Sequence, residues 1–317
     1  MKTVRRLSWT GCLIAAWMLM AYLPMLTACG ASRDDQAAPG ETGDSQAGPA
    51  PDPQAQQLLA DAEQAAGSLT RYAFTLRLTQ KISGDAADAA TDTAESATKT
   101  TDPASESTES VTDSEGRIET DPLKIDQTLR STFAGETNEY RTILVPDGYY
   151  VYDTVFQQWG KLPAEEAKKV AATFSDFQVD LPGAIRQVAA LGPTVASRNE
   201  NGIVVRYEGG GEKARAFVAR LLESSLGWTS QDAASRESLE VQRLLVELTL
   251  DPQRRWPVAY RIEAKMALTL EDGGRTILEQ TLTGTYRKHN ATATIELPDE
   301  AKEAPELGPP LEDSESP

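Results

Sequence analysis

Few residues of this 317-residue chain could do chemistry. Its single histidine, His289, lies in the run TYRKHNATAT near the expected end of a strand, and a hydrolytic triad would need it as the base. No Gly-x-Ser-x-Gly motif accompanies it, so we interpret His289 as a solvent-facing or turn residue. The sequence has no Cys or His cluster that could ligate zinc. We therefore expect no enzymatic activity, no metal and no cofactor.

Two other patterns are typical of catalytic sites but have simpler explanations. The acidic pairs Glu165/Glu166 and Asp176/Asp180 could in principle serve glycoside chemistry. Acids at the start of a helix are better explained by the helix dipole and by solvent exposure. The run of glycines at residues 209–211 precedes an expected helix but lacks the Gly-Lys-Ser/Thr of a phosphate loop. We predict that it joins a strand to a helix.

The N-terminal residues have the pattern of a secretory signal peptide. Residues 1–6 carry three basic side chains and no acid, and residues 13–26 are almost all apolar. This run is shorter than the roughly 20 residues of a membrane-spanning helix and contains Pro24. The pair Arg5-Arg6 lacks the neighbours of a twin-arginine signal, which favours the general export route. We predict a cleaved signal peptide over residues 1–28.

Cys29 follows this leader directly, in the run Leu26-Thr27-Ala28-Cys29. The run resembles the lipobox of bacterial lipoproteins, in which the cysteine is acylated and becomes the first residue of the mature chain. The alternative is ordinary cleavage nearby, with Cys29 as an incidental thiol. The resemblance implies a lipidated Cys29, a chain anchored at the extracytoplasmic face of the cell membrane, and no thiol left for a disulfide.

The net charge of −17 is concentrated outside the expected fold. We predict a flexible linker over residues 29–56, a disordered acidic insertion over 84–121 and an acidic disordered tail over 299–317. The rest, a single domain over residues 57–298, is nearly neutral, so a basic face for nucleic acid is excluded. The acidic insertion lacks the fixed spacing of a calcium loop, which makes calcium capture the weaker alternative.

The domain itself alternates apolar and polar residues with period two, the pattern of half-buried strands. Such strands are predicted in residues 71–82, 124–133, 138–153, 202–208, 239–251, 257–271 and 275–288. Turns at Pro146-Asp147-Gly148 and Asp272-Gly273-Gly274 indicate hairpins and therefore an antiparallel sheet. Helices are expected over residues 53–68, 163–191 and 212–226, where they can cover the dry face of the sheet. The predicted class is α+β.

This order of elements resembles the LolA-like exported proteins, particularly lipoproteins of the LppX and LprG type and Gram-positive lipoproteins of the same shape. The resemblance is carried by the run YYVYDTVFQQWGKLP at residues 149–163 and by ATIELPDEA at residues 293–301. It implies a curved, unclosed half-barrel with helices covering its concave face and an apolar cavity that receives acyl chains in some relatives. The residues expected to face that cavity are Tyr72, Phe74, Leu76, Leu78, Leu244, Val246, Leu248, Leu250, Tyr260, Ile262, Ala264, Met266 and Leu268.

Two functional hypotheses follow. The first is a membrane-anchored carrier or sensor of a lipid or other hydrophobic ligand, with the membrane as partner through its lipid anchor. The second is a non-enzymatic interaction or assembly scaffold of the cell envelope, because an apolar stripe of this kind can equally be a closed core. The sequence names no protein partner for either one.

Overall fold

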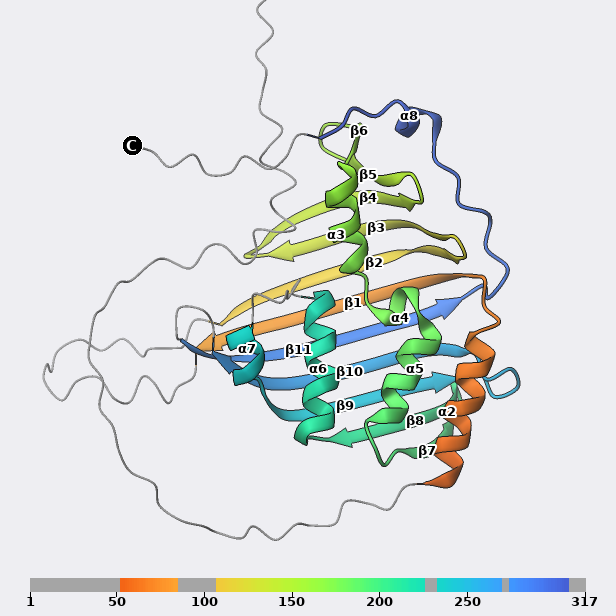
Figure 1. The fold of residues 1–317 in the computed structure, drawn as a ribbon, viewed down its shortest axis with the longest axis vertical. Helices are drawn as coiled ribbons and strands as arrows, with labels where there is room; N and C mark the ends of the chain where they lie inside the picture. Colours follow the sequence, from red (N-terminus) through yellow and green to blue (C-terminus); the bar gives the residue numbers. More distant parts are fainter. Residues whose placement is uncertain (1–51, 85–106, 226–232, 270–273, 308–317) are drawn as a thin grey trace, which may run out of the picture. The chain divides into compact units, whose positions relative to one another are not determined.

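The computed structural model describes residues 52–84, 107–225, 233–269 and 274–307 (Figure 1). All of them belong to one compact unit, Pro51–Leu307. The expected signal peptide, Cys29 and most of the expected linker lie outside the described residues. Within the described residues, each helix is too short or too polar to cross a membrane.

The described strands form one antiparallel sheet with the order β6-β5-β4-β3-β2-β1-β11-β10-β9-β8-β7. Strands that are neighbours in the sheet are also consecutive in the chain, with the exception of β1 and β11. The pairing of β1 with β11 joins two antiparallel meanders, β1 to β6 and β7 to β11, into one sheet. The sheet is unclosed, with β6 and β7 as its edges. The strands are β1 (Arg71–Gly84), β2 (Thr108–Thr120), β3 (Leu123–Phe133), β4 (Glu136–Val145), β5 (Gly148–Asp153), β6 (Gln158–Lys161), β7 (Val195–Asn199), β8 (Gly202–Gly209), β9 (Glu240–Leu250), β10 (Pro257–Thr269) and β11 (Arg275–Arg287).

Helices α2 to α6 lie over one side of this sheet, which we call the helix face (Figure 1). Helices α4, α5 and α6 lie over β1 and β8 to β11, whereas α3 lies over β2 to β5 (Figure 1). The described helices are α2 (Pro53–Ala66), α3 (Ala164–Ala172), α4 (Asp176–Val179), α5 (Leu181–Ala190), α6 (Gly211–Ser225), α7 (Ala233–Ser238) and α8 (Asp299–Lys302). The predicted α+β class, with an open antiparallel sheet and helices over one face, is confirmed.

Short sequence signals fix where the covering helices begin. The carboxylate of Asp52 accepts a hydrogen bond from the backbone N–H of Gln54, and Pro53 follows at the first helical position of α2. Asp180 caps α5 in the same way, through the N–H of Gly183 at 2.9 Å. The chain therefore enters both helices at defined residues, and α2 packs against α5.

The prediction of a disordered insertion over residues 84–121 is wrong for its second half. Residues 108–120 form β2, which pairs with β1 on one side and with β3 on the other. Ile118 and Ser114 are buried on the helix face. Gly116 lies so close to the backbone of β3 that an added Cβ would be 2.3 Å from the carbonyl oxygen of Asp126. Residues 85–106 lie outside the described residues.

The prediction was wrong because it considered the total acidic charge of the segment and not the position of each acid along β2. In the strand they alternate, and they point to the side opposite the helices, which we call the charged face. There Asp113 lies 3.2 Å from Arg77 of β1, and Glu119 lies 2.9 Å from Lys124 of β3. Two neighbouring strands also satisfy the backbone of β2, so a polar composition is compatible with a central strand.

Both outer boundaries of the predicted domain also need correction. The linker predicted over residues 29–56 ends by residue 52, because α2 begins at Pro53. The tail predicted over 299–317 is ordered as far as Leu307, and residues 308–317 lie outside the described residues. The described fold therefore spans residues 52–307 rather than 57–298.

The first part of the predicted tail is ordered because it covers apolar surface and an edge strand. Its backbone runs beside β6, where the N–H of Lys161 donates to the carbonyl of Pro305 and that of Leu307 donates to Lys161. Ala301 and Ile295 are buried with side chains from the charged face of β4 to β6. This small second core consists of Ile143, Tyr150, Trp159, Ile295 and Ala301.

Candidate functional site

The side chains expected to line a cavity lie on the helix face of β1, β9 and β10. Cross-strand pairing brings Tyr260 opposite Leu248 and Ile262 opposite Val246, so their side chains share that face. All of the predicted set are buried except Leu76 and Leu78, which are half-buried. The structure thus brings the set together, most of it beneath helices, and leaves one end of it partly open.

An aromatic cluster fills the space between the sheet and the short helix α4. The ring of Phe177 lies 4.8 Å from that of Tyr260 on β10 and 6.4 Å from that of Phe217 on α6. Tyr260 in turn lies 5.6 Å from Tyr286 on β11. Ring pairs at these separations stabilise a core beyond their area burial. This part of the helix face is therefore filled with side chains.

Two tyrosine hydroxyls hold α4 against the sheet. Tyr72 of β1 donates to the carbonyl oxygen of Gln178, and Tyr286 of β11 donates to that of Phe177. The last carbonyls of a helix have no partner inside it, so these two bonds satisfy groups that would otherwise be buried and unpaired. The tyrosines connect the middle of the sheet to its cover.

Burial raises the pKa of Tyr72, Tyr260 and Tyr286 well above that of a free tyrosine. Burial also raises the pKa of Tyr149 on β5 to about 12, although a hydrogen bond with Thr142 acts in the opposite direction. These hydroxyls stay protonated at physiological pH. Those of Tyr72 and Tyr286 act as hydrogen-bond donors that fix α4 on the sheet.

A different part of the helix face is only partly covered. Leu76 and Leu78 on β1 and Leu129 on β3 are half-buried, while Ile82 and Phe133 are 40% and 38% exposed. The register places all five on the helix face, because Leu76 pairs with Ser114, which pairs with Leu129. Neighbouring strands lie about 4.8 Å apart, so the group spans about 10 Å across β1, β2 and β3. We call these five residues the open patch.

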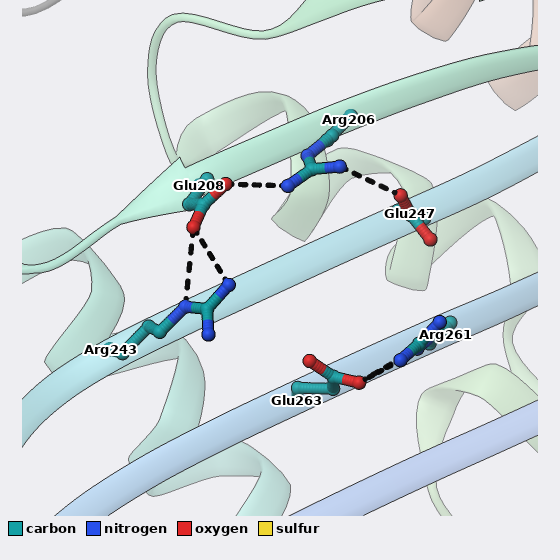
Figure 2. Close-up of polar contacts among 6 residues, drawn as sticks. All are labelled: Arg206, Glu208, Arg243, Glu247, Arg261 and Glu263. Atoms are coloured by element: carbon teal, nitrogen blue, oxygen red, sulfur yellow. Dashed lines mark hydrogen bonds and ion pairs between the residues drawn. The ribbon is translucent and has the colours of Figure 1, made fainter.

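The charged face of β8 to β10 carries a lattice of ion pairs (Figure 2). Glu208 lies 2.6 Å from Arg206 and 2.9 Å from Arg243, and Arg206 also reaches Glu247 at 3.3 Å. Hydrogen bonds from Arg206 and Arg243 lower the pKa of the Glu208 carboxyl. Arg261 and Glu263 form a further pair beside them. Each charge here faces an opposite one, so this surface is neutralised and water-facing.

Three of the acids first considered for catalysis form ion pairs with nearby basic side chains. Glu165 and Glu166 form ion pairs with Lys168 and Lys169 on α3, at 2.9 Å and 2.8 Å. Asp176 lies 2.7 Å from Arg220 on α6. Among the described residues, no group of three or more His, Cys, Asp or Glu side chains could hold a metal ion.

Gly209 and Gly211 lie where the sequence placed them, at the end of β8 and the start of α6. His289 follows the end of β11, half-buried, with its Nε2 2.9 Å from the carbonyl oxygen of Pro257. The expectation of a turn residue agrees with this position.

The sequence reasoning missed part of the helix face. Leu278, Leu282 and Tyr286 of β11 are buried there, and their alternation in the run RTILEQTLTGTYRK was visible. Leu129 and Phe133 of the open patch were also visible as alternating residues of β3. Their partial exposure was not, because it depends on where the helices end.

Two solved structures resemble this chain weakly. The structure of LprF from Mycobacterium bovis aligns with 12% identity and a TM-score of 0.38, covering 79% of this chain and 99% of that one. Lipovitellin, whose structure was described for its lipid–protein interactions, aligns with 8% identity and a TM-score of 0.27. That alignment covers 72% of this chain and 26% of lipovitellin.

Comparison with curated proteins found no match. A family model does match, over residues 54–306, which is nearly all of the described fold. That model is of DUF6612, a family of unknown function. The chain therefore belongs to the DUF6612 family.

Proposed function

We propose that this protein is a membrane-anchored, extracytoplasmic lipoprotein that binds a lipid acyl chain or another hydrophobic ligand on its helix face. The observation that supports this most is the open patch, where five apolar side chains of β1 and β3, on either side of β2, keep contact with solvent. Exposed apolar side chains gathered on one face of a folded domain are typical of a binding site. Anchoring rests on Cys29 and the residues before it.

The ligand surface proposed here is narrower than the full set of residues expected to line a cavity. The members on β9 and β10 are all buried, and Tyr260 packs against Phe177 of α4, so we assign them to the core of the domain. Leu76 and Leu78 are the members that a ligand could reach without moving a helix. An acyl chain along β1 to β3 would cover them together with Leu129.

The driving force would be the removal of this apolar surface from water, worth about 25 cal/mol for each Å² buried. The buried Ser114 lies between Leu76 and Leu129, and its hydroxyl donates to the side chain of Gln127 at 2.9 Å. The Ser114 hydroxyl therefore has a hydrogen-bond partner within the protein, which an apolar ligand would leave in place. The proposed chemistry is binding and carriage, with no catalytic step.

The test is uptake of a fluorescent fatty-acid probe by the full-length chain and two variants. Leu78→Glu places a charge in the open patch at a half-buried position, and we expect probe affinity to fall at least about tenfold, since a charge must then be desolvated. Thr79→Glu makes a comparable change one residue away, on the charged face of the same strand, and should bind the probe like the unmodified chain.

Loss of binding in both variants would point to general electrostatic repulsion rather than to the patch. No uptake by the unmodified chain would contradict the carrier function and leave the scaffold hypothesis in its place.

A further inference from the structure

The end of the sheet at the start of β1 carries a second candidate site, apart from the open patch. The loop between β9 and β10 and the turn after β11 meet there and enclose a shallow hollow of about 390 Å³. Arg254, Trp256, Lys288 and His289 line it, together with one carboxylate, Asp251. We call these four lining residues the basic end.

The aromatic rings of the basic end form a stack. The guanidinium of Arg254 lies over the Trp256 ring, 4.7 Å from its centroid. The imidazole ring of His289 stacks on the same Trp256 ring, with 5.1 Å between the ring centroids and 23° between the ring planes. The bond from His289 to the Pro257 carbonyl fixes the orientation of the imidazole. A cation held on an aromatic face presents its remaining N–H donors in a set direction.

The cations of the basic end are not neutralised as those of the charged face are. Within the described residues, neither Arg254 nor Lys288 has an ion-pair partner. The carboxylate of Asp251 instead accepts hydrogen bonds from the backbone N–H groups of Gln253, at 2.9 Å, and Arg254, at 2.6 Å. Asp251 therefore shapes the loop, and the hollow keeps an excess of positive charge.

The turn that carries Lys288 and His289 is fixed in place. Lys288 and Asn290 have backbone φ angles of 52° and 56°, in the left-handed region that side chains other than asparagine rarely adopt. The side chain of Asn290 holds this turn, because its Oδ1 accepts from the N–H of Thr70 at 2.8 Å and its Nδ2 donates to the carbonyl of Ser68 at 3.1 Å. Positive groups on a rigid turn lose little entropy on binding an anion.

We propose that the basic end docks on the surface of an anionic phospholipid membrane and binds the phosphate of a lipid headgroup. Tryptophan is enriched at the membrane interface, and each basic side chain near an anionic surface strengthens binding about fivefold. The whole chain carries −17, so binding through overall charge is excluded and contact must be local. This site is independent of the ligand surface proposed above.

Docking would also orient the domain. The basic end lies beside the start of β1, at Arg71, whereas Ile82 of the open patch lies near the other end of that strand. At about 3.3 Å per residue the two are about 35 Å apart. Leu76 of the same patch is about 17 Å from Arg71, so the open patch would lie roughly 17 to 35 Å from the membrane that the basic end contacts.

The chain supplies its own reporter, since His289 is its single histidine and its ring protons need no assignment by mutation. We would follow these NMR signals in the full-length chain while adding dihexanoyl phosphatidylglycerol, dihexanoyl phosphatidylcholine or inorganic phosphate. The proposal predicts a saturable shift with the anionic lipid that weakens as salt rises, and little shift with the zwitterionic one. Equal shifts with both lipids, or none with either, would overturn it.

A double charge-reversal variant tests whether Arg254 and Lys288 bind the lipid headgroup. Arg254→Glu with Lys288→Glu should weaken the lipid-induced shift, and flotation with phosphatidylglycerol vesicles, by at least about tenfold. The matched control is Arg198→Glu with Lys213→Glu, which changes net charge equally at exposed cations without an ion pair in the described structure. If both pairs lose binding equally, or if inorganic phosphate alone abolishes the lipid response at low concentration, the membrane site is wrong. If a variant fails to fold, the salt dependence of the lipid-induced shift in the unmodified chain still tests the proposal.

Discussion

The helix face of this sheet has two regions built from the same kind of strand. Over β8 to β11, the apolar side chains are buried beneath α4, α5 and α6, and an aromatic cluster fills the space between them. On the second halves of β1 and β3, similar side chains stay half-buried or exposed. Alternation of apolar and polar residues therefore places the apolar side chains on one face of the sheet. The position of the helices determines which of them are buried in the core.

Strand β2 lies between the two strands that carry the open patch, and removing it should have the largest effect. Replacing residues 108–120 by a Gly/Ser segment would break its pairing with β1 and β3, and we expect loss of cooperative unfolding. Replacing residues 85–106 by a short Gly/Ser turn should change the melting temperature by only a few degrees, because loop-closure entropy varies slowly with length. Thermal unfolding followed by circular dichroism tests both. Cooperative unfolding without β2 would show that the fold does not depend on this strand.

Truncation of one leucine in each region compares them directly. Leu248→Ala on β9 removes a side chain that is 1% exposed and should lower the free energy of unfolding by about 2 to 5 kcal/mol. Leu129→Ala on β3 removes a half-buried side chain and should cost less than about 1 kcal/mol. Urea denaturation measures both. Similar losses would show that the open patch is core.

The tyrosines that hold α4 make the covered region sensitive to high pH. Burial raises the pKa of Tyr286 above that of the unfolded chain, about 10. Its stabilising contribution is therefore complete below pH 10 and is lost as pH rises above it, because only the unfolded chain releases the proton. Tyr286→Phe leaves the carbonyl of Phe177 without this donor, so we expect it to cost about 1 to 3 kcal/mol at neutral pH.

The same variant should lose less stability than the unmodified chain between pH 10 and 11. Denaturant midpoints measured across that range provide the check. An identical pH dependence in the two chains would show that Tyr286 is not responsible.

Substitutions on the charged face should change the stability of the domain least. Glu263→Gln removes the partner of Arg261 at the surface, where a single ion pair contributes at most about 1 kcal/mol. We expect less than about 0.5 kcal/mol in urea denaturation and no change in probe uptake. A larger loss would mean that the lattice of ion pairs acts as a unit.

The strands and helices with strong periodicity could be predicted from the sequence. Residues 257–269 alternate cleanly because one face is buried under helices and the other faces water, and the expected helix at residues 212–226 appears as α6. Strand β2 could not be predicted, because its Ser, Thr and acidic side chains are stabilised by pairing with strands on both sides. Local composition does not contain that information.

The candidate sites were predictable only in part. The sequence indicated which residues share a face, but the exposure of Leu78 depends on how far α3 and α6 reach over the sheet. The basic end combines Arg254 and Trp256 with Lys288 and His289, from two turns that only the pairing of β10 and β11 brings together. No local pattern joins those turns.

The central claim is that a hydrophobic ligand lies on the open patch, and photocrosslinking tests it most directly. A fatty acid with a photoreactive group on its acyl chain would be bound to the full-length chain, irradiated, and the modified peptides identified by mass spectrometry. The account predicts labelling on β1 and β3 around Leu76, Leu78 and Leu129, reduced by unlabelled fatty acid. Labelling confined to other surfaces, or no labelling that unlabelled fatty acid reduces, would contradict it.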